Sequence, residues 1–265
     1  MSPDTKRPKI APHRRAVAAT VAATTPLTGH MTRVTLHSPD FAWIDHQGPD
    51  QLVRLLLPPR PGAGFDLPAT ERWWPEVQAM AADRRPIVRN YTIRRLDRAA
   101  CELDIDFVLH GDSGPASAWA ERARPGDRIG LLSDGARYAP PADTDWQLLV
   151  GDETALPAIG AILDDLDPAT PAVAVLEATD PDAADMLRER DRTTVVRLER
   201  SAGSGASALA HLRGNGLPDG TPYAWVAGES GLATSVRRHL VGERGFDKDR
   251  VYFCGYWREG AVTGS

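Results

Sequence analysis

The sequence is poor in cysteine, with only Cys101 and Cys254 among its 265 residues. The two stand far apart and form no Cys-x-x-Cys pair. This excludes a cysteine-ligated iron–sulfur cluster, a cysteine-rich zinc site and a disulfide framework. The seven histidines are scattered and include no His-x-x-x-His pair. We therefore expect no structural metal.

The sequence also lacks a basic excess, long apolar runs and a signal peptide. Lys and Arg number 31 against 36 Asp and Glu, a net charge of −5, which argues against a nucleic-acid partner. No apolar run approaches the roughly 20 residues that span a bilayer, so we expect no membrane insertion. Residues 1–15 are basic and proline-punctuated but have no apolar centre. These absences predict a cytoplasmic protein with a flexible arm over residues 1–15.

Residues 16–140 have the pattern of a β domain. With 42% hydrophobic and 25% charged residues, the chain has the composition of a globular protein. Short runs of alternating polarity lie between turn signals, and in one of them Leu103, Ile105, Phe107 and Leu109 share a face. Many short strands of this kind predict an antiparallel barrel or sandwich.

Two segments interrupt the β pattern. Pro115–Ala123 is predicted to be a helix because it follows a glycine and stops at Arg-Pro-Gly. Pro58–Pro86 carries several prolines and glycines and is predicted to be an irregular insertion.

Residues 141–265 alternate between strands and helices, after a boundary in the Pro140–Asp145 stretch. Near-continuous apolar strands separated by helices predict a parallel sheet covered on both faces. Such sheets bind ligands at the carboxyl ends of their strands. The predicted strands are residues 146–152, 172–179, 193–200, 223–230 and 251–257, and the predicted helices are residues 153–166, 182–190, 205–213 and 232–244.

A first candidate motif is Arg89-Asn90-Tyr91-Thr92-Ile93-Arg94. On a strand, Arg89 and Tyr91 share a face and Thr92 lies on the other. A guanidinium is a planar fork of donors suited to phosphate, and a tyrosine ring can stack on a flat heteroaromatic. Taken alone, the six residues fit an ordinary amphipathic strand better.

A second candidate is the segment from His110 to Ala120, HGDSGPASAWA. Here a strand runs into a glycine loop that opens a helix, and free amides at a helix start favour negative charge. A routinely capped helix, with Ser113 as the cap, explains the segment equally well.

The order of these motifs is more specific than either alone. A strand with Arg-x-Tyr-Thr, a glycine-rich helix start and then an α/β domain resemble the ferredoxin-reductase superfamily. The segments RNYTIRR, HGDSGPASAWAERARPGD, LLVGDETALPAI, YAWVAGESGLATSVRRHL and GYWREG resemble the siderophore-interacting protein family, the NAD(P)H-dependent ferric siderophore reductases. The resemblance spans Arg54 to Gly260. It implies an FAD-binding antiparallel β-barrel over residues 16–140 and an NAD(P)H-binding α/β domain over residues 141–265.

The resemblance also implies how FAD is held. Arg89 would bind a flavin phosphate, Tyr91 would pack on the isoalloxazine and Thr92 would reach its N5 edge. The segment from Gly114 through Ala116 to Ser117 would offer amides to the pyrophosphate. Trp119 would support the helix or contact the adenine. His110 is assigned to the ribityl chain or a phosphate, and a buried structural histidine is an equal alternative.

For NAD(P)H, the resemblance implies two loops at the carboxyl ends of strands. One contains Asp152, Glu153 and Thr154, where this chain lacks the Gly-x-Gly-x-x-Gly of related reductases. The other contains Glu229 and Ser230 and would admit the nicotinamide. The choice between NADH and NADPH stays open, because Glu177 or Asp180 could bind a ribose and Arg197 or Arg200 could bind a 2′-phosphate.

The resemblance further implies that Arg54, Arg137 and Arg258 receive an anionic ferric siderophore. The expected activity is transfer of electrons from NADH or NADPH through FAD to a ferric siderophore, which releases Fe(II). No side chain is needed as acid or base, because the flavin carries the electrons.

Two other functions are compatible with parts of the pattern. A general NAD(P)H–flavin reductase or ferredoxin-reductase-like electron carrier would share FAD but lack the three arginines. A flavin-free siderophore-binding protein would need the arginines but neither the Arg-x-Tyr-Thr strand nor the glycine loop. The sequence leaves open the siderophore class, the oligomeric state and whether FAD is retained on purification.

Overall fold

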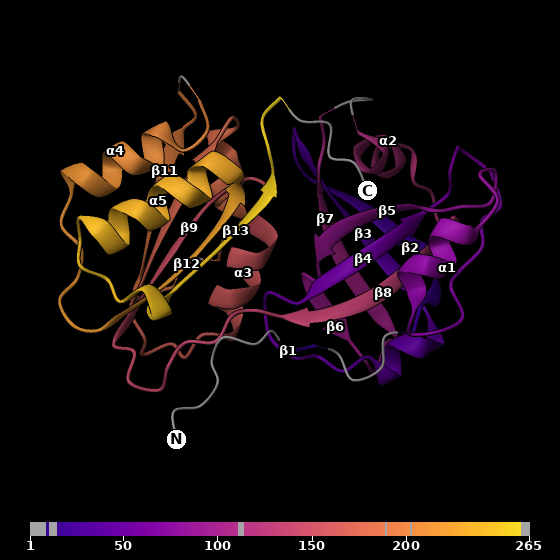
Figure 1. The fold of residues 1–265 in the computed structure, drawn as a ribbon, viewed down its shortest axis with the longest axis horizontal. Coiled ribbons are helices and arrows are strands. Elements are labelled where there is room, and N and C mark those ends of the chain that lie inside the picture. Colours follow the sequence, from indigo (N-terminus) through magenta and orange to yellow (C-terminus); the bar gives the residue numbers. More distant parts are fainter. Residues whose placement is uncertain (1–8, 11–14, 111–113, 189, 202, 261–265) are drawn as a thin grey trace. The chain divides into compact units, whose positions relative to one another are not determined.

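The computed structural model describes residues 9–10, 15–110, 114–188, 190–201 and 203–260. The chain divides into two compact units between Arg137 and Tyr138, close to the predicted boundary at residue 140. Figure 1 shows the two units, the first in indigo and magenta and the second in orange and yellow. Among the residues described, no helix has both the length and the apolar character needed to cross a membrane.

The N-terminal unit is an antiparallel sheet, as predicted. Its strands follow the order β5-β4-β8-β2-β3-β7-β6, and β1 pairs with β8 beside this path. Lys9–Ile10 of the predicted arm thus take part in the sheet. The strands are β1 (Lys9–Ile10), β2 (Val17–Thr28), β3 (Met31–His37), β4 (Leu52–Leu57), β5 (Ile87–Thr92), β6 (Arg95–Asp97), β7 (Glu102–Val108) and β8 (Arg128–Ala136).

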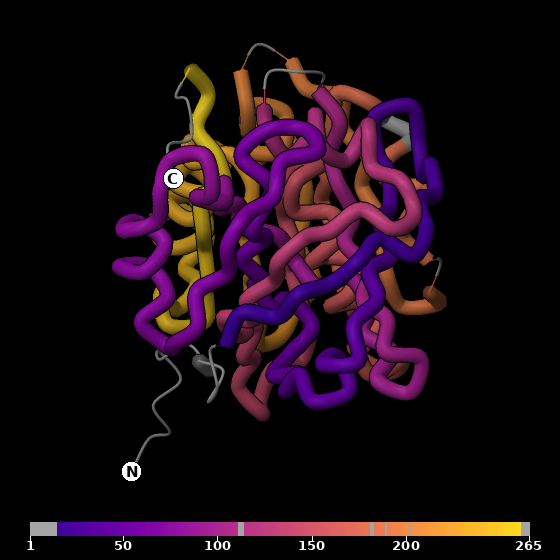
Figure 2. Tube along the Cα trace, turned by 90° about the vertical axis from the view of Figure 1, so that its right-hand side faces the viewer, coloured from indigo at the N-terminus to yellow at the C-terminus, as the bar shows by residue number. Residues whose placement is uncertain are grey.

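This sheet curls into a barrel around one hydrophobic core. Leu103, Ile105 and Phe107 of β7 are buried inside it, as their alternation predicts. Tyr91 of β5 packs against Phe107 with ring centroids 4.5 Å apart, although β5 and β7 are not hydrogen-bonded neighbours. The first strand of this order, β5, therefore meets β7, the last but one, across the core. Figure 2 shows these indigo-to-magenta strands from the side.

The polar residues of β7 lie on the outer face of the sheet in ion pairs. Arg33 of β3 binds Asp106 through two hydrogen bonds of 2.7 and 2.9 Å. Asp104 accepts hydrogen bonds from Thr35 and Arg95. Both carboxylates are buried but paired, which is how a buried charge is tolerated.

Three short helices complete the N-terminal unit. The predicted helix is present as α2 (Pro115–Arg122). The segment Pro58–Pro86 is less irregular than expected, because it contains α1 (Trp73–Ala79). Trp73 and Val77 of α1 bury against the outer face of the barrel, and this tertiary packing stabilises a helix only seven residues long. The 3₁₀ helix η1 (Pro39–Trp43) was not predicted.

The C-terminal unit is a parallel sheet flanked by helices, as predicted. Its strand order is β11-β10-β9-β12-β13. The strands are β9 (Trp146–Asp152), β10 (Ala172–Ala178), β11 (Thr193–Glu199), β12 (Pro222–Glu229) and β13 (Val251–Trp257), and the helices are α3 (Leu156–Asp165), α4 (Ala206–Gly214) and α5 (Ser230–Gly242), with 3₁₀ helices η2 (Pro181–Met186) and η3 (Lys248–Arg250). The helix predicted over residues 182–190 was wrong in type, because η2 is a 3₁₀ helix.

The helices cover the two faces of this sheet unequally. Apolar residues of α4 and α5 pack with Leu148, Val150 and Val226 on one face. Helix α3 covers the opposite face, where a Cβ added to Gly151 would meet Ala155 and Ile159. Because β10 lies on one side of β9 and β12 on the other, the strand order reverses at the β9–β12 pair. In sheets of this kind ligands bind at the carboxyl ends of the strands where the order reverses.

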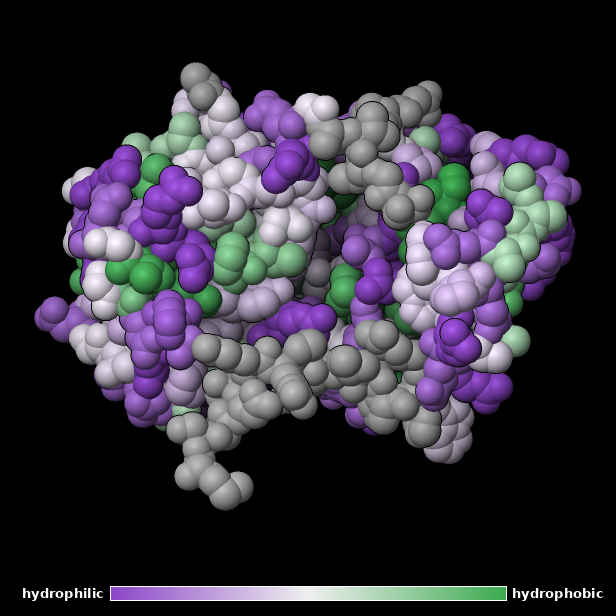
Figure 3. All heavy atoms as spheres, in the orientation of Figure 1, coloured by the Kyte–Doolittle hydropathy of each residue, from purple (hydrophilic) through white to green (hydrophobic). Residues whose placement is uncertain are grey.

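On the face of the molecule shown in Figure 3, hydrophilic residues surround separate hydrophobic areas. Trp43, Phe253 and Tyr256 are the exposed large hydrophobic residues of the described chain. Phe253 contacts the guanidinium of Arg237, and Tyr256 contacts the ring of Trp225. Exposed apolar side chains of this kind are ordinary on a protein surface.

Candidate functional site

Three elements of the N-terminal unit meet in a chain of aromatic rings. Tyr91 of β5 contacts Phe107 of β7, which contacts Trp119 of α2 at 5.8 Å between ring centroids. Tyr91 and Trp119 are half-buried, and burial raises the pKa of the Tyr91 phenol. Two residues predicted to contact flavin are therefore joined through Phe107, which the sequence assigned only to the core. The result is an aromatic platform beside the start of α2.

Arg89 lies on β5 two residues before Tyr91. Its guanidinium donates a 2.7 Å hydrogen bond to the carbonyl oxygen of Val88, and no carboxylate in the described part of the chain pairs with it. Arg33 and Arg95 of the same unit are instead held by carboxylates. A half-buried guanidinium with unused donors fits a phosphate group. Thr92 is buried at the end of the strand.

Helix α2 begins at Gly114 without a side-chain cap from the described residues. Residues 111–113, including Ser113, lie outside the described chain. Ser117 instead accepts a 3.0 Å hydrogen bond from the backbone N–H of His110 and so ties the end of β7 to the helix. A Cβ on Gly114 would lie 2.6 Å from Cε1 of His110, so the imidazole lies directly beside the start of the helix.

These features fit FAD. The guanidinium of Arg89, which no described carboxylate compensates, suits the pyrophosphate. The half-buried ring of Tyr91 suits the isoalloxazine, and the amides of Ala116 and Ser117 in the first turn of α2 suit an anion. His110 lies at the edge of this group and is exposed, so the alternative of a buried structural histidine is wrong.

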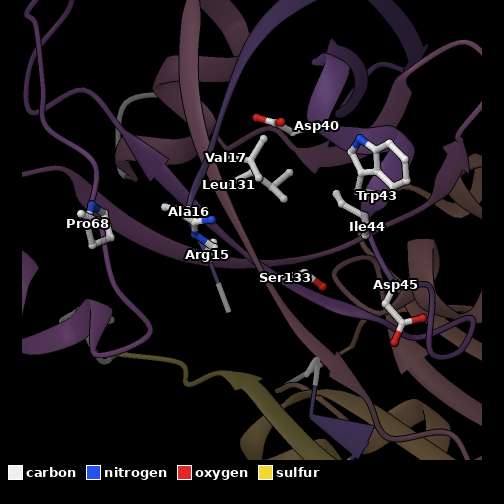
Figure 4. A pocket seen from close by; sticks show the side chains of 11 residues that line it. Arg15, Ala16, Val17, Asp40, Trp43, Ile44, Asp45, Pro68, Leu131 and Ser133 are labelled. Carbon is white, nitrogen blue, oxygen red and sulfur yellow. The ribbon is translucent and has the colours of Figure 1, made fainter. Parts of the chain in front are cut away.

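The N-terminal unit also contains a separate cavity of about 570 Å³. Figure 4 shows Asp40, Trp43 and Asp45 on one side of it and Arg15 on the other. It shares no lining residue with the predicted flavin site. The remaining lining residues are Ala16, Val17, Ile44, Pro68, Ala69, Leu131 and Ser133.

In the C-terminal unit, Asp152 links the two loops predicted to bind NAD(P)H. Its side chain is fully buried at the end of β9. One carboxylate oxygen accepts hydrogen bonds from the backbone and hydroxyl of Thr154, and the other accepts from Glu229 N at 2.7 Å and Trp257 Nε1 at 2.8 Å. Burial raises the pKa of Asp152, and the hydrogen bonds from Thr154 and Trp257 oppose that shift. Asp152 thus holds the loops together rather than reaching outward.

Glu229 is likewise engaged inside the unit. Its carboxylate caps α5 by accepting hydrogen bonds from the backbone N–H groups of Gly231 and Leu232. It also accepts a 3.2 Å hydrogen bond from Glu259 N. Ser230 donates to the carbonyl oxygen of Trp257 at 2.8 Å. The structure therefore brings the end of β12 and the end of β13 together at this loop.

Sequence reasoning missed an arginine–tryptophan pair at the same edge. Arg200 forms an ion pair with Glu153, and its guanidinium lies 5.7 Å from the ring centre of Trp257. The other oxygen of Glu153 accepts the N–H of Thr179. In the sequence, Trp257 is visible only as the aromatic residue of the GYWREG motif. The folded sheet brings its indole to Asp152 at the end of β9 and to Arg200.

The residues considered for the adenosine ribose and 2′-phosphate have different surroundings. Glu177 is fully buried and caps α4 through Gly205 N and Ala208 N at 2.6 and 2.9 Å. It therefore has no oxygen directed to solvent for a ribose. Arg197 pairs with Asp185 on the surface.

The three arginines assigned to the siderophore are distributed over both units. Arg54 of β4 and Arg137 after β8 belong to the N-terminal unit, whereas Arg258 follows β13 in the C-terminal unit and is exposed. Arg54 forms an ion pair with Asp134 of β8, which the sequence analysis did not foresee.

Comparison with known proteins identifies the family of both units. Residues 20–138 match the siderophore-interacting FAD-binding domain, and residues 144–260 match the siderophore-interacting protein family. An uncharacterized protein of Mycobacterium tuberculosis is 32% identical, over 91% of this chain and 89% of its own length. Ferric vibriobactin reductase ViuB of Vibrio cholerae is 28% identical, over 87% of this chain and 85% of its own length.

Solved structures agree with this result. The siderophore-interacting protein SipS from Aeromonas hydrophila is 30% identical, with a TM-score of 0.78 over 94% of each chain. A ferredoxin reductase in carbazole 1,9a-dioxygenase is 17% identical with a TM-score of 0.60, over 91% of this chain and 69% of its own. This second likeness shows the ferredoxin-reductase fold alone.

Proposed function

Because the chain belongs to the siderophore-interacting protein family and contains its FAD-binding domain, we propose that it is an NAD(P)H-dependent ferric siderophore reductase. The observation that carries the proposal is the arrangement around the start of α2. There the Tyr91–Phe107–Trp119 rings adjoin the N-terminus of α2, which no side chain of the described residues caps, on the unit that also carries Arg89, a guanidinium without a carboxylate partner among them. The name of the Vibrio relative, ferric vibriobactin reductase, supports the same reaction.

In this proposal FAD supplies the step that side chains cannot, because it accepts two electrons as a hydride and releases them one at a time. One NAD(P)H then reduces two Fe(III) complexes to Fe(II), yields NAD(P)⁺ and releases one proton. Arg89 would bind the pyrophosphate, Tyr91 would cover the flavin ring, and the amides at Ala116 and Ser117 would bind a phosphate oxygen. His110 would hold the helix start near the flavin through Ser117.

The carboxyl ends of β9 and β12 supply the NAD(P)H site in the proposal. Asp152 and Glu229 act as positioning residues there, because their oxygens are occupied by donors within the unit. Thr154, Glu153 and Ser230 line the same edge. Arg200 is half-buried at this edge, whereas Arg197 is exposed and pairs with Asp185. We therefore favour Arg200 for a 2′-phosphate, although Glu153 already pairs with it.

The proposal assigns Arg54 and Arg137, which both belong to the N-terminal unit, to binding of the ferric siderophore. Iron held by hard anionic oxygens prefers the ferric state, so reduction weakens the complex and frees Fe(II). The side chains therefore need only bind and orient the complex.

Anaerobic reduction of the FAD-loaded protein tests this function. NADH and NADPH should each be added to follow bleaching of the flavin absorbance, and a ferric siderophore should then reoxidise the flavin while an Fe(II) chelator captures the product. A flavin that is reduced but not reoxidised by any ferric complex supports a general electron carrier instead. A protein that binds a ferric siderophore but no flavin supports a flavin-free carrier.

A further inference from the structure

Arg54, the first of the proposed siderophore arginines, is compensated by a buried carboxylate. Its Nη2 lies 2.5 Å from Oδ2 of Asp134, a residue only 2% exposed. Nη1 donates a 3.0 Å hydrogen bond to Oδ1 of Asn90 on β5. The guanidinium also lies over the ring of Trp73, 5.0 Å from its centre. Arg54 is therefore held in one orientation, with its charge paired inside the protein.

Arg137 directly follows β8, and its backbone lies next to a second buried carboxylate. Asp50 precedes β4, is 5% exposed and accepts the backbone N–H of Arg137 at 2.8 Å. Arg54 and Asp134 thus form a two-residue cluster on the antiparallel neighbours β4 and β8, and the formal charge of this cluster is zero. Both carboxylates are fixed by the fold, so a ligand cannot displace them as it could displace a surface counter-ion.

The charge of a ferric siderophore depends on its ligating groups. Three hydroxamates carry one negative charge each and neutralise Fe(III), which gives a neutral core. Three catecholates carry two negative charges each, which leaves the complex at −3. A recognition surface for a −3 complex needs uncompensated cations, because desolvating three negative charges requires partners.

We propose that the Arg54–Asp134 pair selects neutral ferric tris-hydroxamates over triply negative ferric tris-catecholates, with Asp134 as the residue that determines this specificity. The inference rests on the proposed function for the location of the substrate. The paired Arg54 remains a donor of hydrogen bonds, and the Trp73 ring beneath it keeps the guanidinium plane fixed. Such a group can bind the neutral oxygens of a hydroxamate without offering a net positive charge to a catecholate.

Redox-inert gallium complexes separate binding from reduction. We would measure binding of two Ga(III) complexes to the FAD-loaded protein by isothermal titration calorimetry. Their ligands carry three hydroxamates or three catecholates on the same tripodal scaffold. The wild type should bind the neutral complex more tightly, and its affinity for the −3 complex should depend little on salt. Tighter binding of the −3 complex, weakening as salt increases, would overturn the proposal, and so would binding of neither complex.

Asp134→Asn then tests the residue itself. Loss of the negative charge that compensates Arg54 should tighten binding of the −3 complex about fivefold or more at 0.1 M salt. Binding of the neutral complex should change less than twofold. Asp66→Asn removes one negative charge from an exposed residue of the same unit and is the matched control, expected to change neither affinity. Equal changes for both complexes in Asp134→Asn would contradict a charge-based selection.

The double variant Arg54→Gln/Asp134→Asn keeps the cluster neutral and should return the −3 complex to wild-type affinity. The wild-type comparison stands by itself even where Asp134→Asn does not fold. The proposed function fails in a different way. A protein that binds the gallium complexes with this selectivity but reduces no ferric complex would be a siderophore carrier, not a reductase.

Discussion

The indole N–H of Trp257 donates a 2.8 Å hydrogen bond to the buried carboxylate of Asp152, 105 positions earlier in the chain. This bond joins the end of β13 to the end of β9, two strands separated in the sheet by β12. The same carboxylate holds Glu229 N on that intervening strand. A single buried acid therefore sets the relative positions of three strand ends.

Trp257→Phe should destabilise the C-terminal unit by about 1–3 kcal/mol, because it leaves one oxygen of a buried carboxylate with one donor fewer. The phenylalanine ring keeps much of the apolar contact, so the loss reports the hydrogen bond. Urea unfolding followed by circular dichroism measures the change. Trp43→Phe is the control, since Trp43 is 86% exposed and its replacement should have almost no effect. Unchanged unfolding of Trp257→Phe would show that the bond contributes nothing.

Arg89→Ala should lose most of its FAD during purification. The pyrophosphate would lack its charged partner, and charge-assisted hydrogen bonds to phosphate are stronger than neutral ones. The ratio of flavin absorbance to protein absorbance measures occupancy. Arg60→Ala, at an exposed arginine of the same unit, should keep wild-type occupancy. Full occupancy in Arg89→Ala would remove this residue from the flavin site.

Glu229→Ala should slow reduction of the flavin by NAD(P)H on the order of tenfold, because small displacements of a binding loop have large effects on hydride transfer. The substitution removes the cap of α5, which stabilises the helix by about 0.5–2 kcal/mol. Photochemically reduced protein should still reduce ferric complexes at the wild-type rate. Stopped-flow absorbance measures both half-reactions.

Glu229→Gln is the matched control for that substitution. Its side-chain oxygen can still accept the Gly231 and Leu232 N–H groups, so we expect near wild-type flavin reduction. Equal slowing of both half-reactions in Glu229→Ala would place the residue outside the NAD(P)H site.

Gly228→Ala should destabilise the C-terminal unit by more than about 1 kcal/mol and impair NAD(P)H use. Gly228 has φ +131°, and an added Cβ would lie 2.7 Å from Cγ of Asp152. Neither the backbone nor the buried carboxylate can move without breaking the hydrogen bonds of Asp152. Thermal unfolding tests this expectation. Gly242→Ala, in open space at the end of α5, should be tolerated, and equal loss in the two variants would refute the steric argument.

Periodicity was sufficient to predict most elements of both units. Strands β9 and β13 have the predicted bounds, and α2 ends within one residue of its prediction. The errors have local causes. Helix α1 is only seven residues long and depends on burial of Trp73, and η2 is too short for period 3.6 to distinguish a 3₁₀ helix from an α-helix.

The candidate site was predictable as a set of motifs but not as a set of contacts. The motifs containing Arg89, Tyr91 and Trp119 identified the flavin-binding unit, and the matching family confirms an FAD-binding domain there. The role of Phe107 between two of these residues depends on the meeting of β5 and β7 across the barrel. No spacing within one strand contains that information.

The sequence alone determined the two fold classes, because the period of apolar residues depends only on local backbone geometry and on which side of an element is buried. It also determined the family, because the motifs are contiguous segments. Only the tertiary structure decided what each charged residue faces. The pairing of Arg54 with Asp134 arises because β4 and β8 are antiparallel neighbours, and the engagement of Asp152 arises from the order of three parallel strands. The pairing register of strands far apart in the sequence decides which charged side chains become neighbours. No local sequence pattern therefore predicts these pairs.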